Sequence, residues 1–283
     1  MATFSDFKKE MLFLDDFATL MEILKSLAIM QYYELAKKIK GFDRFKKTLK
    51  SFFQVFNSQN ILHPLDSGKG PLTVIAITSE KGFVGGTNHK VINVSLNYVK
   101  EAGGKIIVIG KQGQWLVKEK DVEYECFPGI ESARKLEQAL ALRDHIFREV
   151  SAGRMGSVKV VYPQASSLLV QTTETQTLIP ISEWTNEEKT PVSYPELIQE
   201  SNSDAIFDYL VFLYLGKKLA DIFDASLLAE YASRYVHLEE STEKIKEENN
   251  KLKFQYFRAR HEIIDQQMRE LFSAQSLIQG IDA

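Results

Sequence analysis

The last third of the chain is the feature that most limits how it can fold. From Lys217 to Gln279 there is no glycine and no proline. One helix over this range would be on the order of 95 Å long at roughly 1.5 Å per residue. Residues at alternating steps of three and four form a heptad seam, which comprises Leu228, Tyr231, Tyr235, Leu238, Thr242, Ile245, Asn249, Leu252, Tyr256, Ala259 and Ile263. A helix of this length cannot bury such a stripe by itself, so the pattern predicts a helical partner.

The N-terminal segment can supply that partner. Residues from about Ser5 to Phe56 contain one glycine, Gly41, and no proline, and they are predicted to be helical. Two apolar series run along neighbouring faces: Phe13, Phe17, Leu20, Leu24 and Leu27, and Phe7, Met11, Leu14, Ala18 and Met21. This arc is wider than a two-stranded coiled coil requires. The helix is therefore either a core helix of a bundle or one that contacts both a coiled-coil partner and an enclosing surface.

The middle of the chain has a different period. Residues 57–71 hold two prolines and two glycines and are predicted to be a linker. Strands are then expected at 72–78, 105–109, 122–127 and 158–162, a strand or hairpin at 168–181, and helices at 88–101, 112–118 and 131–150. Strands alternating with helices of this length predict a mainly parallel sheet with helices on its faces. Residues 183–203 are predicted to be a surface loop before helix resumes near Asp204.

These segments define the predicted fold class, which is α/β. Residues 1–56 and 204–283 are expected to pair as an antiparallel coiled coil, because neither helix has a reason to be stable alone at its length. An inserted, Rossmann-like α/β domain is expected at residues 72–203.

Composition excludes several classes of function. The formal net charge of −3 over 283 residues gives no reason to expect a nucleic-acid partner. The single cysteine, Cys126, rules out an internal disulfide and is expected to be a small buried residue. The N-terminus does not resemble a secretory signal, and no apolar run is long enough to span a membrane. The five histidines are scattered, and no catalytic, cofactor or metal constellation emerges.

A glycine-rich turn follows the first predicted strand. Backbone amides at such a turn can hold a phosphate, which keeps a nucleotide-using enzyme open as an alternative. The segment SEKGFVGGT, residues 79–87, matches neither common phosphate-binding pattern. Lys81 precedes the glycines, and Glu80 places a negative charge where phosphate would lie. The structural interpretation is a tight turn in which glycine permits a positive φ and close packing.

Two segments resemble the gamma subunit of F-type ATP synthases. Residues 78–88 are similar to the family pattern S-T-D-[RK]-G-L-[CA]-G-G-x-N, with matches at Lys81, Gly82, Gly85, Gly86 and Asn88. Residues 256–267 are similar to Y-N-x-A-R-Q-x-x-I-T-x-E, with matches at Tyr256, Ala259, Arg260 and Ile264. Glu80, His261, Asp265 and Gln267 depart from these patterns.

The resemblance implies a non-catalytic rotor that binds no nucleotide and no cofactor. Its paired helices would turn inside a ring of three alpha and three beta subunits. Its α/β domain would meet an epsilon-like subunit and the membrane c-ring, on the cytoplasmic side of a bacterial inner membrane. By position, a beta-subunit loop would be caught by Arg260 and His261, with Gln266 and Gln267 nearby. The glycine motif at Lys81, Gly82, Gly85, Gly86 and Asn88 would belong to the domain that contacts these partners.

One departure leaves the partner of the α/β domain open. The family has a polar run, R-R-Y-V-E-S-Q, where this chain has Tyr209 to Leu215, YLVFLYL. Tyr209, Phe212 and Tyr214 are therefore expected to face the ring, an epsilon-like subunit or a substitute partner. The alternatives are an N-type, sodium-coupled ATPase, an F-like ATPase that drives a non-proton partner, and a coiled-coil scaffold with an α/β binding module that is unrelated to any motor.

The end of the C-terminal helix is predicted to differ from the rest. After Ile263 the apolar positions Ile264, Met268 and Leu271 continue one residue out of phase. A one-residue shift rotates the stripe by about 100°. These last turns are expected to face a surrounding sleeve instead of a partner helix.

Overall fold

The computed structural model describes residues 4–39, 52, 63, 65, 70–181 and 202–279. The chain divides into two compact units, and both contain parts of the helices α1 (Phe4–Ile39) and α7 (Ser203–Gln279). Unit 1 comprises Met1–Leu27 and His237–Ala283, and unit 2 comprises Ala28–Val236. Apart from Phe52, the rest of the predicted N-terminal helix, to Phe56, lies outside the described residues, and so does nearly all of the predicted loop at 183–203.

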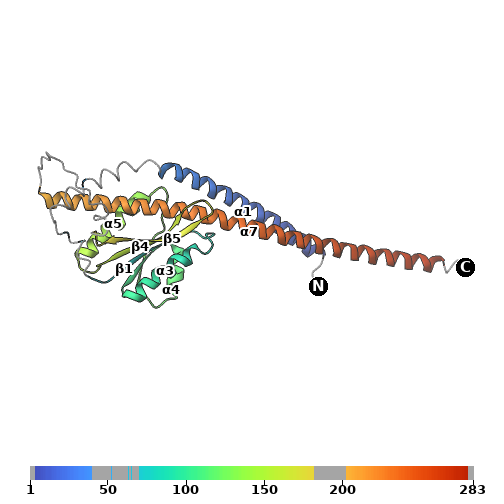
Figure 1. The fold of residues 1–283 in the computed structure, drawn as a ribbon. Coiled ribbons are helices and arrows are strands. Elements are labelled where there is room, and N and C mark those ends of the chain that lie inside the picture. The colour runs from blue at the N-terminus through green and yellow to red at the C-terminus, as the bar shows by residue number, and fades with distance from the viewer. Residues whose placement is uncertain are drawn as a thin grey trace. The chain divides into compact units, whose positions relative to one another are not determined.

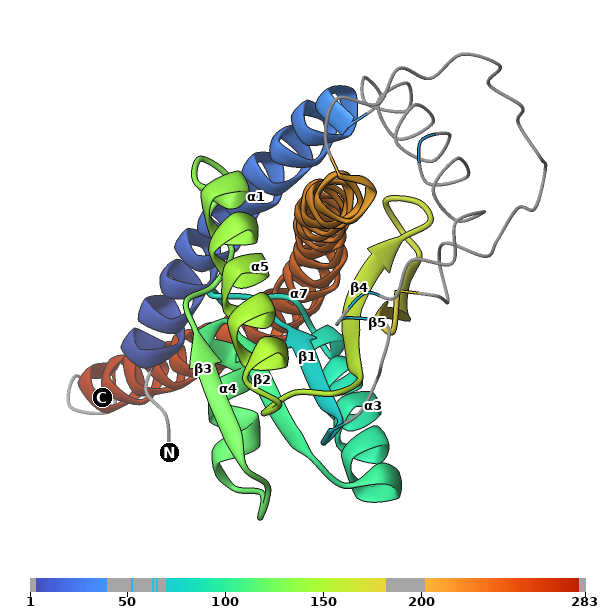
Figure 2. The same ribbon diagram turned by 90° about the vertical axis from the view of Figure 1, so that its left-hand side faces the viewer.

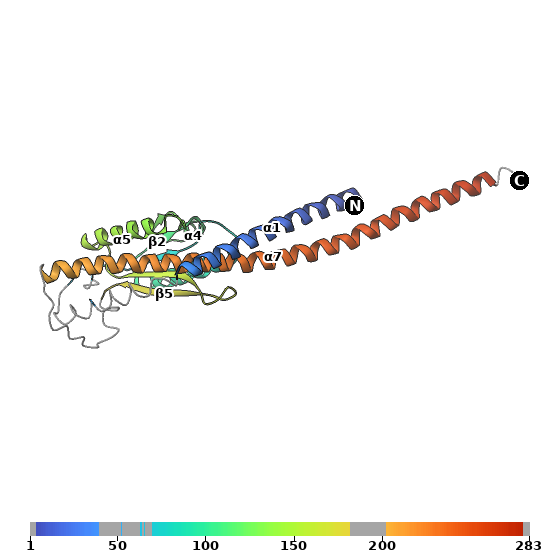
Figure 3. The same cartoon turned by 90° about the horizontal axis from the view of Figure 1, so that it is seen from above.

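Unit 1 contains the predicted antiparallel coiled coil. Figures 1 and 3 show α1 and α7 side by side. Ion pairs and a hydrogen bond join them in antiparallel order: Lys25 with Glu239, Glu22 with Lys246, and Asp15 with Asn249. The heptad seam is confirmed from Leu238 to Leu252, because Leu238, Thr242, Asn249 and Leu252 are buried, whereas Ile263 at the end of the predicted seam is exposed. On α1 the series that includes Met11 and Met21 lies in the contact, whereas Phe13, Leu20 and Leu27 remain exposed.

Polar residues interrupt the seam. The Thr242 hydroxyl donates to the carbonyl of Leu238, at 2.7 Å, and the Asn249 amide donates to the Asp15 carboxylate. The Asn249 Oδ1 atom is buried without a hydrogen-bond partner among the described residues. A polar residue at a seam position lowers stability but selects one register of the two helices. Asn249 therefore fixes how α1 and α7 are aligned in unit 1.

The α/β domain in unit 2 is built on a five-stranded sheet of order β3-β2-β1-β4-β5. These strands are β1 (Thr73–Ile77), β2 (Lys105–Ile109), β3 (Tyr124–Phe127), β4 (Val158–Ala165) and β5 (Gln171–Ile179). The pairs β1–β2, β1–β4 and β2–β3 are parallel, and β5 runs antiparallel to β4. The mainly parallel sheet is confirmed, and the segment predicted as a strand or hairpin supplies the antiparallel edge.

Helices cover both faces of the sheet (Figure 2). The helices α3 (Thr87–Ala102) and α4 (Lys111–Lys118) pack on one face, against Val74 and Ala76 of β1. The helix α5 (Lys135–Ser151) and the first part of α7 pack on the other, against Ile75 and Ile77. Side chains of a strand alternate between faces, so β1 is buried on both sides. The start of α7 is thus a core helix of the α/β domain.

The prediction that Cys126 is buried is wrong, because its side chain is exposed. The strand β3 lies at the edge of the sheet. Cys126 shares its side of β3 with the exposed Tyr124, whereas Phe127 on the other side packs against the core. Alternation along an edge strand thus decides which side chains are covered.

Within the ranges that the structure describes, we find no helix with the length and apolarity needed to cross a membrane.

Candidate functional site

The glycine loop, residues 79–88, leaves the C-terminal end of β1. Asn88 is buried at its far end, where its Oδ1 accepts from the backbone N–H of Ser79, at 3.1 Å, and its Nδ2 donates to the Ser79 hydroxyl, at 2.9 Å. Gly85 has a positive φ of 56°, as the sequence predicted for a tight turn. Phe83 also has a positive φ, of 63°, which is rare for an aromatic residue and marks local strain. Lys81, Gly85 and Gly86 lie on the exposed side of the loop.

Glu80 ties this loop to two other segments. Its Oε2 accepts backbone N–H groups of Lys111, at 3.2 Å, and Gly129, at 3.0 Å, and its Oε1 lies 2.9 Å from the Lys111 Nζ. The side-chain hydrogen bond from Lys111 is the largest influence and holds the pKa of Glu80 below its usual value, although burial acts in the opposite direction. The chain's own carboxylate thus occupies the Lys111 amide at the start of α4 and the Gly129 amide after β3, where a bound phosphate would compete with it.

Glu80→Gln is expected to lower the free energy of unfolding at pH 7 by about 1 kcal/mol, the usual net value of such hydrogen bonds. Because the folded-state pKa of Glu80 is depressed, its stabilisation is present above the usual value of 4.5 and is lost as the pH falls through the folded-state value. Urea unfolding of both chains at pH 7 and pH 3 measures this. The difference in free energy of unfolding between the parent chain and Glu80→Gln should be smaller at pH 3 than at pH 7. An equal difference at both pH values would mean that the Glu80 charge does not contribute.

A small cleft lies beside the glycine loop, at the end of β1. Its lining includes Thr78, Ser79, Asn88, Ser226 and Glu230. Its free space is about 10 Å³, which is room for roughly one water molecule, whereas small-molecule sites commonly hold roughly 300–1,000 Å³. Together with the position of Glu80, this size does not favour the nucleotide-using alternative. Among the described side chains, no three His, Cys, Asp or Glu residues converge to hold a metal ion.

The loop also contacts α7, which sequence reasoning missed. The Thr87 hydroxyl donates to the Ser233 Oγ, at 3.0 Å, and the Arg234 Nε donates to the carbonyl of Gly82, at 3.4 Å. Arg234 also pairs with Glu230, one turn earlier on α7. The spacing of Glu230 and Arg234 is visible in the sequence as an i, i+4 pair. Their position beside the loop is visible only in the structure.

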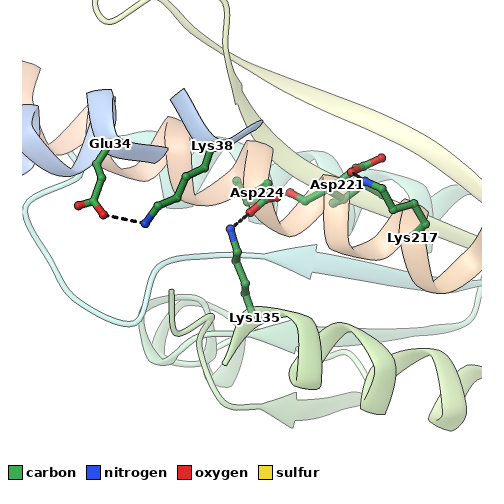
Figure 4. A network of polar contacts seen from close by, with 8 residues as sticks. Glu34, Lys38, Lys135, Lys217, Asp221 and Asp224 are labelled. Atoms are coloured by element: carbon green, nitrogen blue, oxygen red, sulfur yellow. Dashed lines mark hydrogen bonds and ion pairs between the residues drawn. The ribbon is translucent and has the colours of Figure 1, made fainter. Parts of the chain in front are cut away.

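Figure 4 shows three further ion pairs, one between α5 and α7 and two within single helices. Lys135, at the start of α5, forms an ion pair with Asp224 of α7. Lys217 and Asp221 pair along α7, and Glu34 and Lys38 pair along α1, at 2.7 Å. The labelled groups are partly or well exposed, so the apolar core supplies most of the energy that holds α7.

The predicted beta-subunit contact residues lie near the end of α7. Arg260, His261, Gln266 and Gln267 are all exposed. At 3.6 residues per turn, Arg260 and Gln267 share one face of the helix, whereas His261 and Gln266 point to other sides. The Gln266 amide donates to Glu270, at 3.0 Å. The structure therefore brings two of these four side chains onto one surface.

Every described side chain from His261 to Ser273, which we call the tip of α7, is exposed. In Figures 1 and 3 this part of unit 1 continues past the N-terminal end of α1. Its apolar side chains are between 42% and 66% exposed: Ile263, Ile264, Met268, Leu271 and Phe272. The out-of-phase stripe thus has no helical partner among the described residues of unit 1.

The three residues predicted to meet a partner of the α/β domain lie in different surroundings. Tyr209 is 61% exposed, but Tyr214 is only 5% exposed and belongs to the core. The guanidinium of Arg143 lies over the ring of Phe212, 3.4 Å from its centre. Tyr214 therefore offers no surface to a partner, and the predicted contact rests on Tyr209 and the open side of Phe212.

Comparison with known proteins first defines the class. A family model described as ATP synthase matches residues 11–277. The architecture is shared with a chain of the Euglena gracilis mitochondrial ATP synthase OSCP/F1/c-ring structure, at a TM-score of 0.69 and 14% identity, over 97% of this chain and 94% of that one. A chain of the Tetrahymena thermophila mitochondrial ATP synthase central stalk/c-ring structure gives a TM-score of 0.60 at 16% identity, over 78% of this chain and 99% of that one.

Curated relatives narrow the class. The ATP synthase gamma chain of Chlorobium phaeobacteroides (strain BS1) is 28% identical over 232 residues, which cover 77% of this chain and 78% of the relative. That of Ruminococcus albus is 24% identical over 266 residues, which cover 90% and 92%. The chain belongs to the gamma-chain family of ATP synthases.

Proposed function

We propose that this chain is the central-stalk rotor of an F-type or F-like ATP synthase or ATPase. It carries torque between a ring of three alpha and three beta subunits and a membrane ring, and it is itself non-catalytic. The observation that carries the proposal is the tip of α7, a helix with exposed apolar side chains on a chain of this family. A helix that is apolar on an exposed face requires a surrounding surface.

The exposed apolar stripe of α1 also supports the proposal of a surrounding surface, which we call the sleeve. Leu12, Phe13, Leu20, Ile23 and Leu27 all remain exposed although α1 already has a partner in unit 1. Apolar side chains without fixed ion pairs let a helix turn against a sleeve, since such contacts are non-directional. The alpha and beta subunits are the proposed sleeve.

The α/β domain is proposed to meet an epsilon-like subunit and a c-ring, or a substitute for it, through Tyr209, Phe212 and the glycine-motif region. The complex would lie on the cytoplasmic side of a bacterial inner membrane, with this chain as a peripheral subunit. A rotor of an F-like ATPase with a non-proton partner is the second candidate, because Tyr209 presents an aromatic ring where the family pattern is polar.

Reconstitution tests the rotor function. The purified chain should hydrolyse no ATP alone and should restore ATPase activity when it is combined with its alpha and beta subunits. A fully active alpha–beta complex that forms without this chain would overturn the proposal.

Arg260→Ala is expected to lower the ATPase rate of the reconstituted complex by up to about ten-fold, the effect of losing roughly 1.4 kcal/mol of charge-assisted binding to a beta-subunit carboxylate. Arg258→Ala is the matched control, because Arg258 is an exposed arginine of the same helix that pairs with Glu262. Circular dichroism should show both variants folded. Equal rates for Arg260→Ala and Arg258→Ala would contradict the role of Arg260.

A further inference from the structure

Two adjacent residues of α7, near the C-terminal boundary of unit 2, make polar contacts with the glycine loop. Ser233 accepts from the Thr87 hydroxyl, at 3.0 Å, and Arg234 donates to the Gly82 carbonyl, at 3.4 Å. In the sequence, these residues come shortly before His237, where α7 enters unit 1. A torque that passes along α7 from unit 1 would therefore reach this contact early in the α/β domain.

The arginine in this contact is held on both sides. Its Nη2 donates to the Glu230 carboxylate while its Nε donates to the loop. Both side chains are largely buried, with 14% of Arg234 and 16% of Glu230 exposed. A planar guanidinium held by two acceptors has little rotational freedom. Arg234 therefore acts as a rigid arm between α7 and the loop.

The loop itself is braced. Asn88 and Ser79 close it with two hydrogen bonds, and the Ser79 hydroxyl donates to the carbonyl of Lys81, at 2.7 Å. Glu80 fixes it to the backbone at Lys111 and Gly129. The loop thus forms a stiff extension of β1, the central strand of the sheet.

Directional contacts resist a motion that apolar packing does not. The core that holds α7 on the sheet is non-directional, so it opposes separation more than rotation of α7 about its own axis. Hydrogen bonds weaken steeply once their angles are lost, so a small rotation breaks the contacts of Ser233 and Arg234. These contacts are suited to resist torsion.

We propose, on the basis of the rotor function above, that Thr87, Ser233, Arg234 and Glu230 form a torsional clamp. The clamp locks the glycine loop of the α/β domain to α7, so that the domain turns with the helix. Its members are positioning residues, because they set the angle between α7 and the sheet and touch no reacting atom.

The first arm of the test loosens the clamp. The variant Thr87→Val/Glu230→Gln/Arg234→Met removes the directional contacts and leaves no unpaired charge. With the tip of α7 held in the alpha–beta ring, the thermal angular fluctuation of a bead on the α/β domain reports torsional stiffness. The fluctuation should increase relative to the parent chain. Arg154→Met, which removes an arginine of the same domain that pairs with Glu149, is the matched control and should leave it unchanged.

The second arm tightens the clamp reversibly. The hydroxyls of Thr87 and Ser233 lie 3.0 Å apart, so Thr87→Cys/Ser233→Cys in a Cys126→Ser background should form a disulfide. Formation of the disulfide should lower the angular fluctuation to the parent value or below, and chemical reduction of the disulfide should raise it again. This switch occurs within one folded chain, so a general loss of stability cannot produce it.

The outcomes separate the clamp from the rotor function. If the parent chain fails to restore ATPase activity to alpha and beta subunits, the rotor function fails. If it does restore activity, but the loosened variant fluctuates like the parent and Arg154→Met, the clamp is wrong. A cysteine pair that does not cross-link would contradict the placement of Thr87 beside Ser233. If the loosened variant does not fold, the cysteine pair decides alone.

Discussion

Phe223→Ala is expected to lower the free energy of unfolding by about 3–5 kcal/mol, the usual cost of removing a buried aromatic ring. Phe223 is 2% exposed and lies on α7 among the apolar side chains that pack against the sheet. Its loss leaves a cavity that the neighbouring strands cannot fill, because sheet geometry holds their backbones apart. Urea unfolding followed by circular dichroism measures the change.

Phe254→Ala is the matched control for this substitution. Phe254 belongs to the same helix but is 78% exposed. Its removal should change the free energy of unfolding by less than about 0.5 kcal/mol, as is usual for surface positions. Similar losses for the two alanine variants would show that the start of α7 is not a core helix of the α/β domain.

Gly110→Ala is expected to lower the free energy of unfolding by about 2–5 kcal/mol, through backbone strain and a steric clash together. Gly110 follows β2 with a φ of 98°, which favours glycine. A Cβ there would lie 2.4 Å from the carbonyl oxygen of Thr78 and 2.8 Å from that of Ser79. Backbone atoms cannot yield as a flexible side chain would. Thermal and urea unfolding of the purified variant give the magnitude.

Gly82→Ala provides the comparison, since a Cβ at Gly82 meets no atom within 4 Å. This variant should unfold within about 0.5 kcal/mol of the parent, as surface substitutions do. If Gly110→Ala lowered the free energy of unfolding as little as Gly82→Ala, this would contradict the close approach of the backbone after β2 to the backbone after β1.

Much of the candidate site could be anticipated only in outline. The glycine pattern located a tight turn, and Gly85 has the positive φ expected there. The positive φ of Phe83 was indicated by no sequence rule. The phase shift after Ile263 predicted a change at the end of the C-terminal helix, and the exposed tip of α7 agrees with it. Tyr214 was grouped with Tyr209 because both lie in one apolar run, yet only Tyr209 is exposed.

Local patterns in the amino-acid sequence account for the repeating parts of this protein. The seam through Leu238 and Leu252 and the alternation of strands and helices follow from local periods, because a helix repeats every 3.6 residues and a strand every two. The tertiary structure alone decided which strand is an edge and which distant segments meet. It exposed Cys126 on β3 and brought Arg234 beside Gly82, 152 positions away in the chain. Such contacts depend on strand order and on the path of α7 across the sheet, which no local period encodes.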